Sequence, residues 1–155
     1  MNKQLGVTLV ELLVGLVILS AVMMTAVPLT SSWVNSAMVR DAQALLQQAY
    51  GRTKALGLAN PAAIKTGEAA AYMCVANAHL YVQPINAGTC GTGYAWGAEL
   101  KSGVSITVSG AGQFSCLGMD ARGVPVALTL GESTCTTSKA LTVSKGNQND
   151  STTLY

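Results

Sequence analysis

The sequence predicts an α+β chain in which a long N-terminal helix precedes an antiparallel β-sheet. The run from Leu12 to Leu29 is apolar and uncharged, and apolar residues then recur at helical spacing as far as Leu56. After Pro61, short runs of aromatic and β-branched residues alternate with glycine-rich turns. Hydrophobic residues make up 50% of the 155 residues and charged residues 10%, which excludes a disordered chain. The length fits one globular unit plus one apolar helix.

The apolar run is long enough to cross, or nearly cross, a membrane. As a helix, Leu12 to Leu29 would rise about 27 Å, against a hydrocarbon thickness of about 30 Å. The run is longer than the apolar region of a secretory signal peptide, and Glu11 stands near its start. Lys3 on the near side favours a cytoplasmic N-terminus and an exported C-terminal part. An ordinary membrane anchor is the alternative that apolarity alone does not exclude.

The helical pattern continues beyond the apolar run, but on one face only. Polar residues occupy the remaining faces, as in an amphipathic helix packed against other structure. The apolar positions are Val34, Met38, Ala42, Leu45, Ala49 and Leu56. We therefore expect an amphipathic half of the helix over residues 31–57, with its apolar stripe on one face of a sheet.

Proline and glycine set the expected shape and end of the helix. Pro28 lacks an N–H and should kink the helix. The segment LGLANP should end it near Gly57, because glycine, asparagine and proline follow one another closely. The prediction is one bent helix from about Val7 to Leu56, with its membrane-embedded half at residues 7–30.

The remaining residues, 58–155, are predicted to form a sheet domain, and the globular part of the chain should begin at about residue 35. Short strands joined by tight turns indicate antiparallel pairing. The candidate strands are Tyr72–Gln83, Tyr94–Leu100, Val104–Val108, Phe114–Met119, Val124–Leu130 and Ala140–Val143. The polar tail Lys145–Tyr155 is either a final edge strand or frayed.

Four cysteines lie after the apolar run, and none forms a CxxC pair. An even number of cysteines behind an export-like segment favours disulfides in an oxidising compartment over a zinc or thioredoxin-like site. Four cysteines allow three connectivities. We favour Cys74 with Cys90 and Cys116 with Cys135, because each bond would close a turn-rich loop and bridge adjacent strands.

The N-terminal segment carries a motif that apolarity does not explain. Glu11 would cost roughly 2.5 kcal/mol or more at a bilayer centre, so a carboxylate there needs a reason. The string GVTLVELL follows a short basic leader, residues 1–6, and precedes the apolar run and Pro28. This arrangement resembles the processing site of type IV prepilins and type II secretion pseudopilins. Val7 is a departure, because the family usually has phenylalanine or methionine there.

The resemblance implies a type IV pilin-like fold and a processing reaction. A prepilin peptidase would cut between Gly6 and Val7, remove residues 1–6 and methylate the new amine of Val7. Glu11 would then face the N-terminal amine of an adjacent subunit in a filament and fix the register of the helices, because apolar surfaces alone have no register. A glutamate that only marks the membrane interface is the alternative.

Later segments narrow the resemblance to minor pilins of the GspH/FimT type. The segments are ALLQQAYGRTKALGLANP, GYAWGAEL and FSCLGMDARGVPV. They imply a minor type IV pilin that initiates or caps a pilus, with a GspH-like pseudopilin of a type II secretion system as one alternative. The implied partners are other pilin or minor pilin subunits, prepilin peptidase and the inner-membrane assembly platform. The implied location is the bacterial inner membrane, with a periplasmic C-terminal domain, and then the filament.

DNA binding, as in competence pilins of the FimT type, is a further alternative. In that group an arginine-rich C-terminal motif binds DNA, whereas this tail offers Lys139 and Lys145, no arginine and one nearby acid, Asp150. Two lysines are a weak phosphate footprint, and the net charge of +2 is scattered. Solvated surface charge is the favoured interpretation of both lysines.

No catalytic, metal or cofactor site is predicted. His79 is the only histidine and is expected to be a surface or packing residue in a strand from Ala76 to Val82. Asp120 and Glu132 are single carboxylates in predicted turns. The sequence has no phosphate-binding loop, HExxH or GxSxG motif. We expect no enzyme activity and no cofactor.

Overall fold

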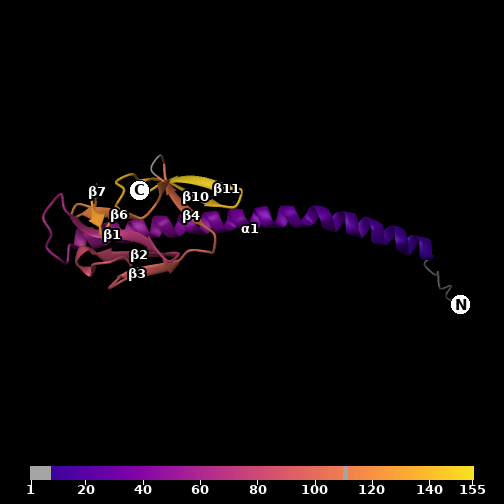
Figure 1. The fold of residues 1–155 in the computed structure, drawn as a ribbon, viewed down its shortest axis with the longest axis horizontal. Helices are drawn as coiled ribbons and strands as arrows, with labels where there is room; N and C mark the ends of the chain where they lie inside the picture. Colours follow the sequence, from indigo (N-terminus) through magenta and orange to yellow (C-terminus); the bar gives the residue numbers. More distant parts are fainter. Residues whose placement is uncertain (1–7, 110–111) are drawn as a thin grey trace. The chain divides into compact units, whose positions relative to one another are not determined.

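The structure, a computed structural model, describes residues 8–109 and 112–155, without the side chains of residues 25–29. The chain divides into two compact units, Met1–Val34 and Asn35–Tyr155. The helix α1 (Leu9–Ala59) runs through the boundary between them, and the strands all belong to the second unit (Figure 1). The fold is therefore α+β with one long N-terminal helix, as the sequence predicted.

Within the described residues the second unit adds short strands and one 3-10 turn. The strands are β1 (Ala69–Ala76), β2 (His79–Pro84), β3 (Trp96–Glu99), β4 (Ser105–Val108), β5 (Gly112–Gln113), β6 (Cys116–Asp120), β7 (Pro125–Val126), β8 (Thr129–Leu130), β9 (Ser133–Thr134), β10 (Ala140–Lys145) and β11 (Gln148–Thr153), and the turn η1 is Ile85–Ala87.

The helix ends three residues later than predicted, because Asn60 and not Gly57 terminates it. Asn60 adopts a left-handed conformation, with φ of 41°. Its N–H donates to the carbonyl oxygens of Leu56 and Gly57, both at 3.1 Å. Its side chain then bonds Ile64, accepting from the N–H at 2.8 Å and donating to the carbonyl oxygen at 2.9 Å. Asparagine tolerates this conformation and satisfies the last carbonyls of the helix.

Gly57 has a different role, which is close packing. A Cβ atom at this position would lie 2.8 Å from the backbone oxygen of Asp120, at the end of β6. The glycine lets the last turns of the helix approach the end of β6 more closely than any other residue would.

The strands form two main sheets instead of the single sheet that was expected. One has the order β3-β2-β1-β6-β7, and the other has the order β11-β10-β4-β5. A small hairpin, β8-β9, stands apart from both. Within the described residues the pairings between these strands are antiparallel, as predicted, and a single isolated bridge, Leu117 with Thr136, is parallel.

Two predicted strands are each split in the structure. The run Tyr72–Gln83 is a hairpin in which Asn77 and Ala78, with φ of 51° and 59°, connect β1 to β2. A two-residue turn with two positive φ values matches the twist of the paired strands. The run Val124–Leu130 is divided between β7 and β8. The tail forms the edge strand β11, so it is not frayed.

One hydrophobic core joins the second half of the helix to both sheets. The helix contributes Val39, Ala42, Leu46, Ala49 and Tyr50, all buried, and the sheets contribute residues such as Met73, Leu117, Ile106 and Leu141. The buried stripe is offset from the predicted one. Val34 is 45% exposed, and Leu45 and Leu56 lie at the edge of the core. The helix packs against two sheets and not one, so its buried apolar stripe is centred on different residues from the stripe that was predicted.

Candidate functional site

The N-terminal end of the helix is capped by Thr8, the residue just before it. Thr8 directly precedes the first helical residue, and its Oγ1 accepts the N–H of Glu11 at 3.3 Å. The carbonyl oxygen of Thr8 accepts the N–H of Leu12 at 3.2 Å. Thr8 is thus the N-cap and Glu11 the third helical residue, the positions of a capping box. The carboxylate of Glu11 also lies in the first turn, where negative charge interacts favourably with the helix dipole.

Apolar side chains are exposed on every side of the helix from Leu9 to Met24. Their exposed fractions range from 51% at Val14 to 82% at Leu9. A helix that is apolar all round is normally buried in a larger assembly or a membrane. This segment therefore needs an environment that comes from outside the chain.

The predicted membrane-spanning half is not seen as such. In the part of the chain that the structure describes, no helical stretch is both long enough and apolar enough to cross a bilayer. The membrane-embedded half at residues 7–30 stays a prediction.

The second unit has a sulfur-rich cluster that is separate from the main core. Cys74 is bonded to Cys90, and Cys116 is bonded to Cys135, with Cα–Cα distances of 6.0 Å and 4.6 Å. Cys74, Cys116 and Cys135 are buried and pack with Tyr72. The cluster ties two loop regions to β1 and β6, namely residues 85–92 and the β8–β9 region.

Hydrogen bonds reinforce the first of these attachments. The fully buried side chain of Gln83 accepts the N–H of Gly91 at 3.0 Å and donates to the carbonyl oxygen of Thr89 at 2.9 Å. It also donates to the hydroxyl of Tyr72, which in turn donates to the carbonyl oxygen of Gly88 at 2.6 Å. Burial raises the pKa of Tyr72, while the bond from Gln83 acts in the opposite direction. Residues 85–92 are therefore held by both a covalent bond and a buried polar network.

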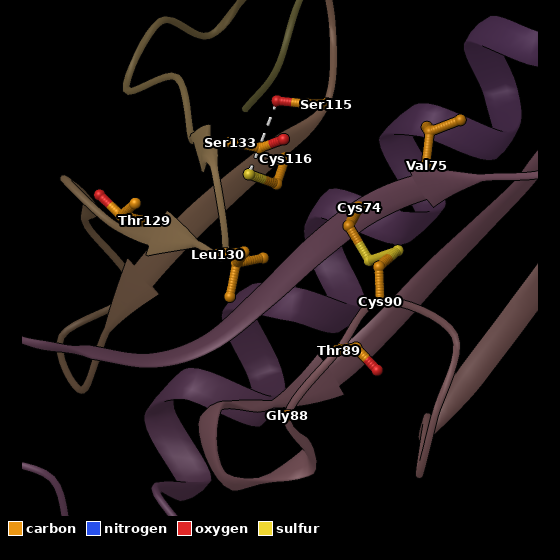
Figure 2. Close-up of a pocket in the computed structure, with 11 residues that line it drawn as sticks. Cys74, Val75, Gly88, Thr89, Cys90, Ser115, Cys116, Thr129, Leu130 and Ser133 are labelled. Carbon is orange, nitrogen blue, oxygen red and sulfur yellow. Dashed lines mark hydrogen bonds between the residues drawn. A yellow bond between two sulfur atoms is a disulfide. The ribbon is translucent and has the colours of Figure 1, made fainter.

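A cavity of about 340 Å³ lies between the two attached regions (Figure 2). Cys74, Cys90 and Cys116 line it, together with hydroxyl-bearing side chains and glycines of the two flanking regions. No charged residue lines the cavity. The cavity therefore borders both cysteines of one disulfide and Cys116 of the other.

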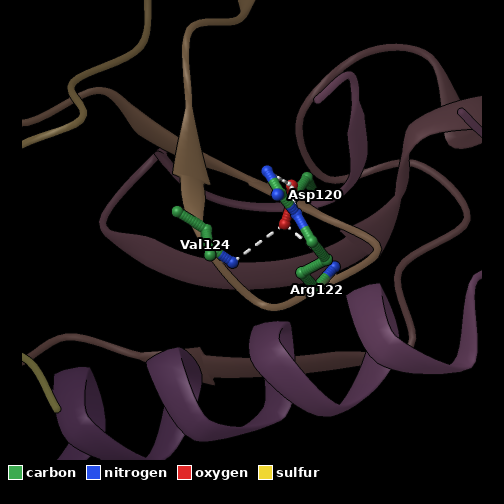
Figure 3. Close-up of polar contacts among 3 residues, drawn as sticks. All are labelled: Asp120, Arg122 and Val124. Carbon is green, nitrogen blue, oxygen red and sulfur yellow. Dashed lines mark hydrogen bonds and ion pairs between the residues drawn. The ribbon is translucent and has the colours of Figure 1, made fainter. Parts of the chain in front are cut away.

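Asp120 organises the turn between β6 and β7 (Figure 3). Its side chain is fully buried, and one carboxylate oxygen accepts the N–H groups of Arg122 at 2.9 Å and Val124 at 3.0 Å. The other oxygen pairs with the Arg122 guanidinium at 2.9 Å. Burial by itself would raise the pKa of Asp120, but these hydrogen bonds and the Arg122 charge together lower it. The contacts are those of a structural turn and need no substrate to explain them.

The N-terminal segment also matches a known protein family motif. Residues 1–27 match the prokaryotic N-terminal methylation motif. The methylation motif supports a type IV pilin-like or pseudopilin precursor that is processed by prepilin peptidase and assembles with other pilin subunits. It also implies anchoring in the inner membrane, followed by entry into a filament. No curated protein and no solved structure matches the chain.

The methylation motif covers the predicted site residues Gly6, Val7 and Glu11, and Pro28 directly follows it. Gly6 and Val7, the predicted cleavage site, lie outside the described residues. Glu11 lies in the first turn of the helix with its side chain exposed. Pro28 is within α1, and its side chain is among those that the structure does not describe. The T-x-x-E pattern from Thr8 to Glu11 is the sequence signature of this cap, which the sequence-based prediction missed.

The predicted residues outside the methylation motif do not gather at one site. Lys139 is exposed, whereas Lys145 is half-buried and its Nζ donates to the carbonyl oxygen of Ser102. His79 is half-buried, with its Nδ1 2.9 Å from the carbonyl oxygen of Asn77. It is the first residue of β2, so the predicted strand from Ala76 to Val82 is not continuous. Glu132 is exposed in the turn between β8 and β9. Among the described residues no cluster of histidine, cysteine and carboxylate side chains could hold a metal ion.

Proposed function

We propose that the chain is a minor type IV pilin, a structural subunit that is cut between Gly6 and Val7, methylated on Val7 and built into a pilus. The match of residues 1–27 to the methylation motif carries this proposal. The exposed apolar helix that follows supports it, because such a helix requires other helices or lipid around it. The chain's role is to build the filament, and no enzymatic step is assigned to it.

Processing provides the first test. Co-expression of the full chain with a prepilin peptidase should yield a protein that lacks residues 1–6 and carries a methyl group on its new N-terminus, as measured by intact mass. A Gly6→Leu variant is the matched control, since it changes only the residue before the cut and should remain at full length. A wild-type chain that keeps its first six residues would refute the filament assignment.

We assign to Glu11 the role of fixing the position of the subunit's helix relative to neighbouring helices in the filament. Its carboxylate is exposed in the first helical turn and is surrounded along the chain by apolar residues. Apolar helix surfaces slide past one another with little preference, whereas a carboxylate facing the N-terminal amine of an adjacent subunit fixes one depth. The desolvation of both charges offsets much of their attraction, so the pair specifies position more than it adds stability.

Filament incorporation of Glu11 variants tests this role. Glu11→Gln keeps the shape of the side chain and removes its charge, and it should be processed normally but be lost from sheared filaments on an immunoblot. Ser20→Ala is the control, because it alters another exposed polar residue of the same segment without removing charge. Incorporation of Glu11→Gln at the wild-type level would exclude the register role.

The proposal that the chain is a minor pilin and not a major one depends on the number and position of the disulfides in the second unit. Major pilins more often have one C-terminal disulfide loop, whereas this chain has two disulfides that attach to the central strands β1 and β6. Together with the resemblance to GspH/FimT-type subunits, this favours a subunit that initiates or caps the filament. Deletion of the gene should then reduce the number of pili, whereas a pseudopilin of a type II system would reduce secretion instead.

A further inference from the structure

The two disulfides share one point of the sheet. In the pairing of β1 with β6, Cys74 lies directly opposite Cys116. Both side chains belong to the same small cluster, so both point to the same face of the sheet. Each disulfide thus begins at one member of this cross-strand pair: Cys74 is bonded to Cys90, as Figure 2 shows, and Cys116 is bonded to Cys135.

The hydrogen-bond pattern shows which kind of cross-strand pair this is. The N–H of Val75 donates to the carbonyl oxygen of Ser115 at 2.9 Å, which places that bond just beside the cysteine pair. Antiparallel pairs alternate between hydrogen-bonded and non-hydrogen-bonded, so Cys74 and Cys116 form a non-hydrogen-bonded pair. In such a pair the Cα atoms lie about 4.5 Å apart and the side chains are closest. That separation falls inside the range of about 4.4–6.8 Å that a disulfide requires.

Access to this pair is provided by the cavity. Cys90 is the only one of the four cysteines that is not buried, and it lines the cavity with Cys74 and Cys116. A thiol that enters the cavity therefore meets Cys90 first. The lining carries no charge, so a thiolate reagent meets no fixed negative charge there.

We propose that the two disulfides form a thiol–disulfide exchange site whose reactant is a dithiol, and that reduction at Cys90 produces a new disulfide between Cys74 and Cys116. The cross-strand position of Cys74 beside Cys116, together with a cavity that reaches Cys90, carries this inference. It is independent of the filament assignment, because it depends only on the second unit of the chain.

The reaction balances without any further reactant. A thiolate of the dithiol attacks Sγ of Cys90, the Cys74–Cys90 bond breaks, and Cys74 leaves as a thiolate. Cys74 attacks Sγ of Cys116, the Cys116–Cys135 bond breaks, and Cys135 leaves as a thiolate that takes a proton from water. The second thiol of the dithiol displaces Cys90 from the mixed disulfide. The dithiol has then lost two electrons and two protons, and the protein has one disulfide and two thiols.

The consequence is that one reduction releases two loop regions. The region 85–92 loses its covalent bond to β1, and the region of β8 and β9 loses its bond to β6, while β1 and β6 become linked to each other. These two regions flank the cavity. A single two-electron reduction would therefore remove the covalent bond on each side of the cavity, while the hydrogen bonds of Gln83 still hold region 85–92.

Limited reduction of the full chain in detergent micelles tests the proposal. The protein is treated with one equivalent of dithiothreitol at about pH 8, near the ordinary thiol pKa, then alkylated with N-ethylmaleimide and digested with trypsin without reduction. Cleavage after Lys65, Lys101, Arg122 and Lys139 places Cys74 and Cys90 in peptide 66–101, Cys116 in peptide 102–122 and Cys135 in peptide 123–139. A bond from peptide 66–101 to Cys116, a bond from it to Cys135 and the Cys116–Cys135 bond thus give different pairs of linked peptides, and fragmentation of peptide 66–101 shows which of Cys74 and Cys90 carries the alkyl group.

The expected main product among once-reduced molecules links peptide 66–101, through Cys74, to peptide 102–122. In this product Cys90 and Cys135 carry the alkyl group. If peptide 102–122 instead stays linked mainly to peptide 123–139, with Cys74 and Cys90 alkylated, no exchange has occurred and the proposal is overturned. Selective loss of the Cys116–Cys135 bond with Cys74–Cys90 intact would also overturn it.

Paired double variants test the geometry without any reductant. Cys90→Ser with Cys135→Ser leaves only the cross-strand pair, which should oxidise fully to a Cys74–Cys116 disulfide in air. Cys74→Ser with Cys116→Ser leaves only the two loop cysteines, which should remain reduced for much longer. Equal rates of oxidation in the two variants, or no bond in the first, would refute the cross-strand assignment. The wild-type experiment remains decisive even if either variant folds poorly.

Discussion

Replacing Gly57 with alanine is the most direct test of how the helix meets the sheets. In most helices this change is stabilising, because glycine is less favourable than alanine by about 0.8–1.0 kcal/mol. At Gly57 the added Cβ would lie 2.8 Å from the backbone oxygen of Asp120, a separation that Cβ atoms essentially never show. The conflict is with backbone, so no flexible side chain can rotate away. The helix end or β6 must move instead.

The expected magnitude follows from these two opposing effects. Overpacking a well-packed contact costs about 1–3 kcal/mol. Subtracting the helix gain of about 1 kcal/mol leaves a net loss of up to about 2 kcal/mol in the free energy of unfolding. The neighbouring β6–β7 turn limits relaxation, because Asp120 is fully buried and bound to Arg122.

Gly51 provides a matched control in the same helix. It is exposed, and nothing lies within 4 Å of the place where its Cβ would be. Gly51→Ala should therefore raise the unfolding free energy by about 1 kcal/mol, from helix propensity alone. Both variants are compared with wild type by urea unfolding of the full chain in detergent, followed by circular dichroism. If Gly57→Ala stabilises the protein as much as Gly51→Ala does, the close contact with Asp120 does not exist.

Two further changes test the buried polar groups. Burial would raise the pKa of Asp120, but its hydrogen bonds and the charge of Arg122 together lower the pKa. The ionised carboxylate therefore stabilises the fold at pH values above the ordinary carboxyl pKa. This stabilisation is lost as the pH falls through the lower pKa of the folded state. Asp120→Asn should flatten the loss of urea stability on acidification, and an unchanged slope would contradict this. Gln83→Leu should lower the unfolding free energy by about 1–3 kcal/mol, because the carbonyl oxygen of Thr89 and the N–H of Gly91 lose their hydrogen-bond partner. An unchanged urea midpoint would show that the disulfide alone holds the loop 85–92.

Elements that depend on local sequence periodicity were predictable. The helical repeat of apolar residues gave one long helix, and alternating aromatic and β-branched residues placed strands near their observed positions. The turn at Asn77 and Ala78 was missed because alanine with a positive φ has no sequence signature. The division into two sheets was also missed, since it depends on which strands pair, and pairing is decided by tertiary packing.

Some residues of the candidate sites were likewise predictable from the sequence, and others were not. The segment around Glu11 is a local motif that the sequence analysis singled out, although the cap at Thr8 was missed and the roles of Gly6, Val7 and Glu11 stay predictions. The opposition of Cys74 and Cys116 was not, because the two residues belong to strands that are distant in sequence and come together only through the β1–β6 register. Gly57 was taken for a helix stop, because its actual role depends on a backbone oxygen of β6.

The two faces of the β1–β6 pair are stabilised by different means, which has a consequence for redox chemistry. The inner face packs against the helix in the large hydrophobic core, whereas the outer face has only the small cluster around Tyr72 and the disulfides. The two disulfides therefore add covalent bonds to a face that has only a small cluster of packed side chains. Exchange of those bonds would therefore loosen the outer loops while leaving the contact between helix and sheets in place. If the chain is assembled into a filament through α1, as proposed, such an exchange alters the outer surface of the subunit without breaking the contact between its helix and sheets.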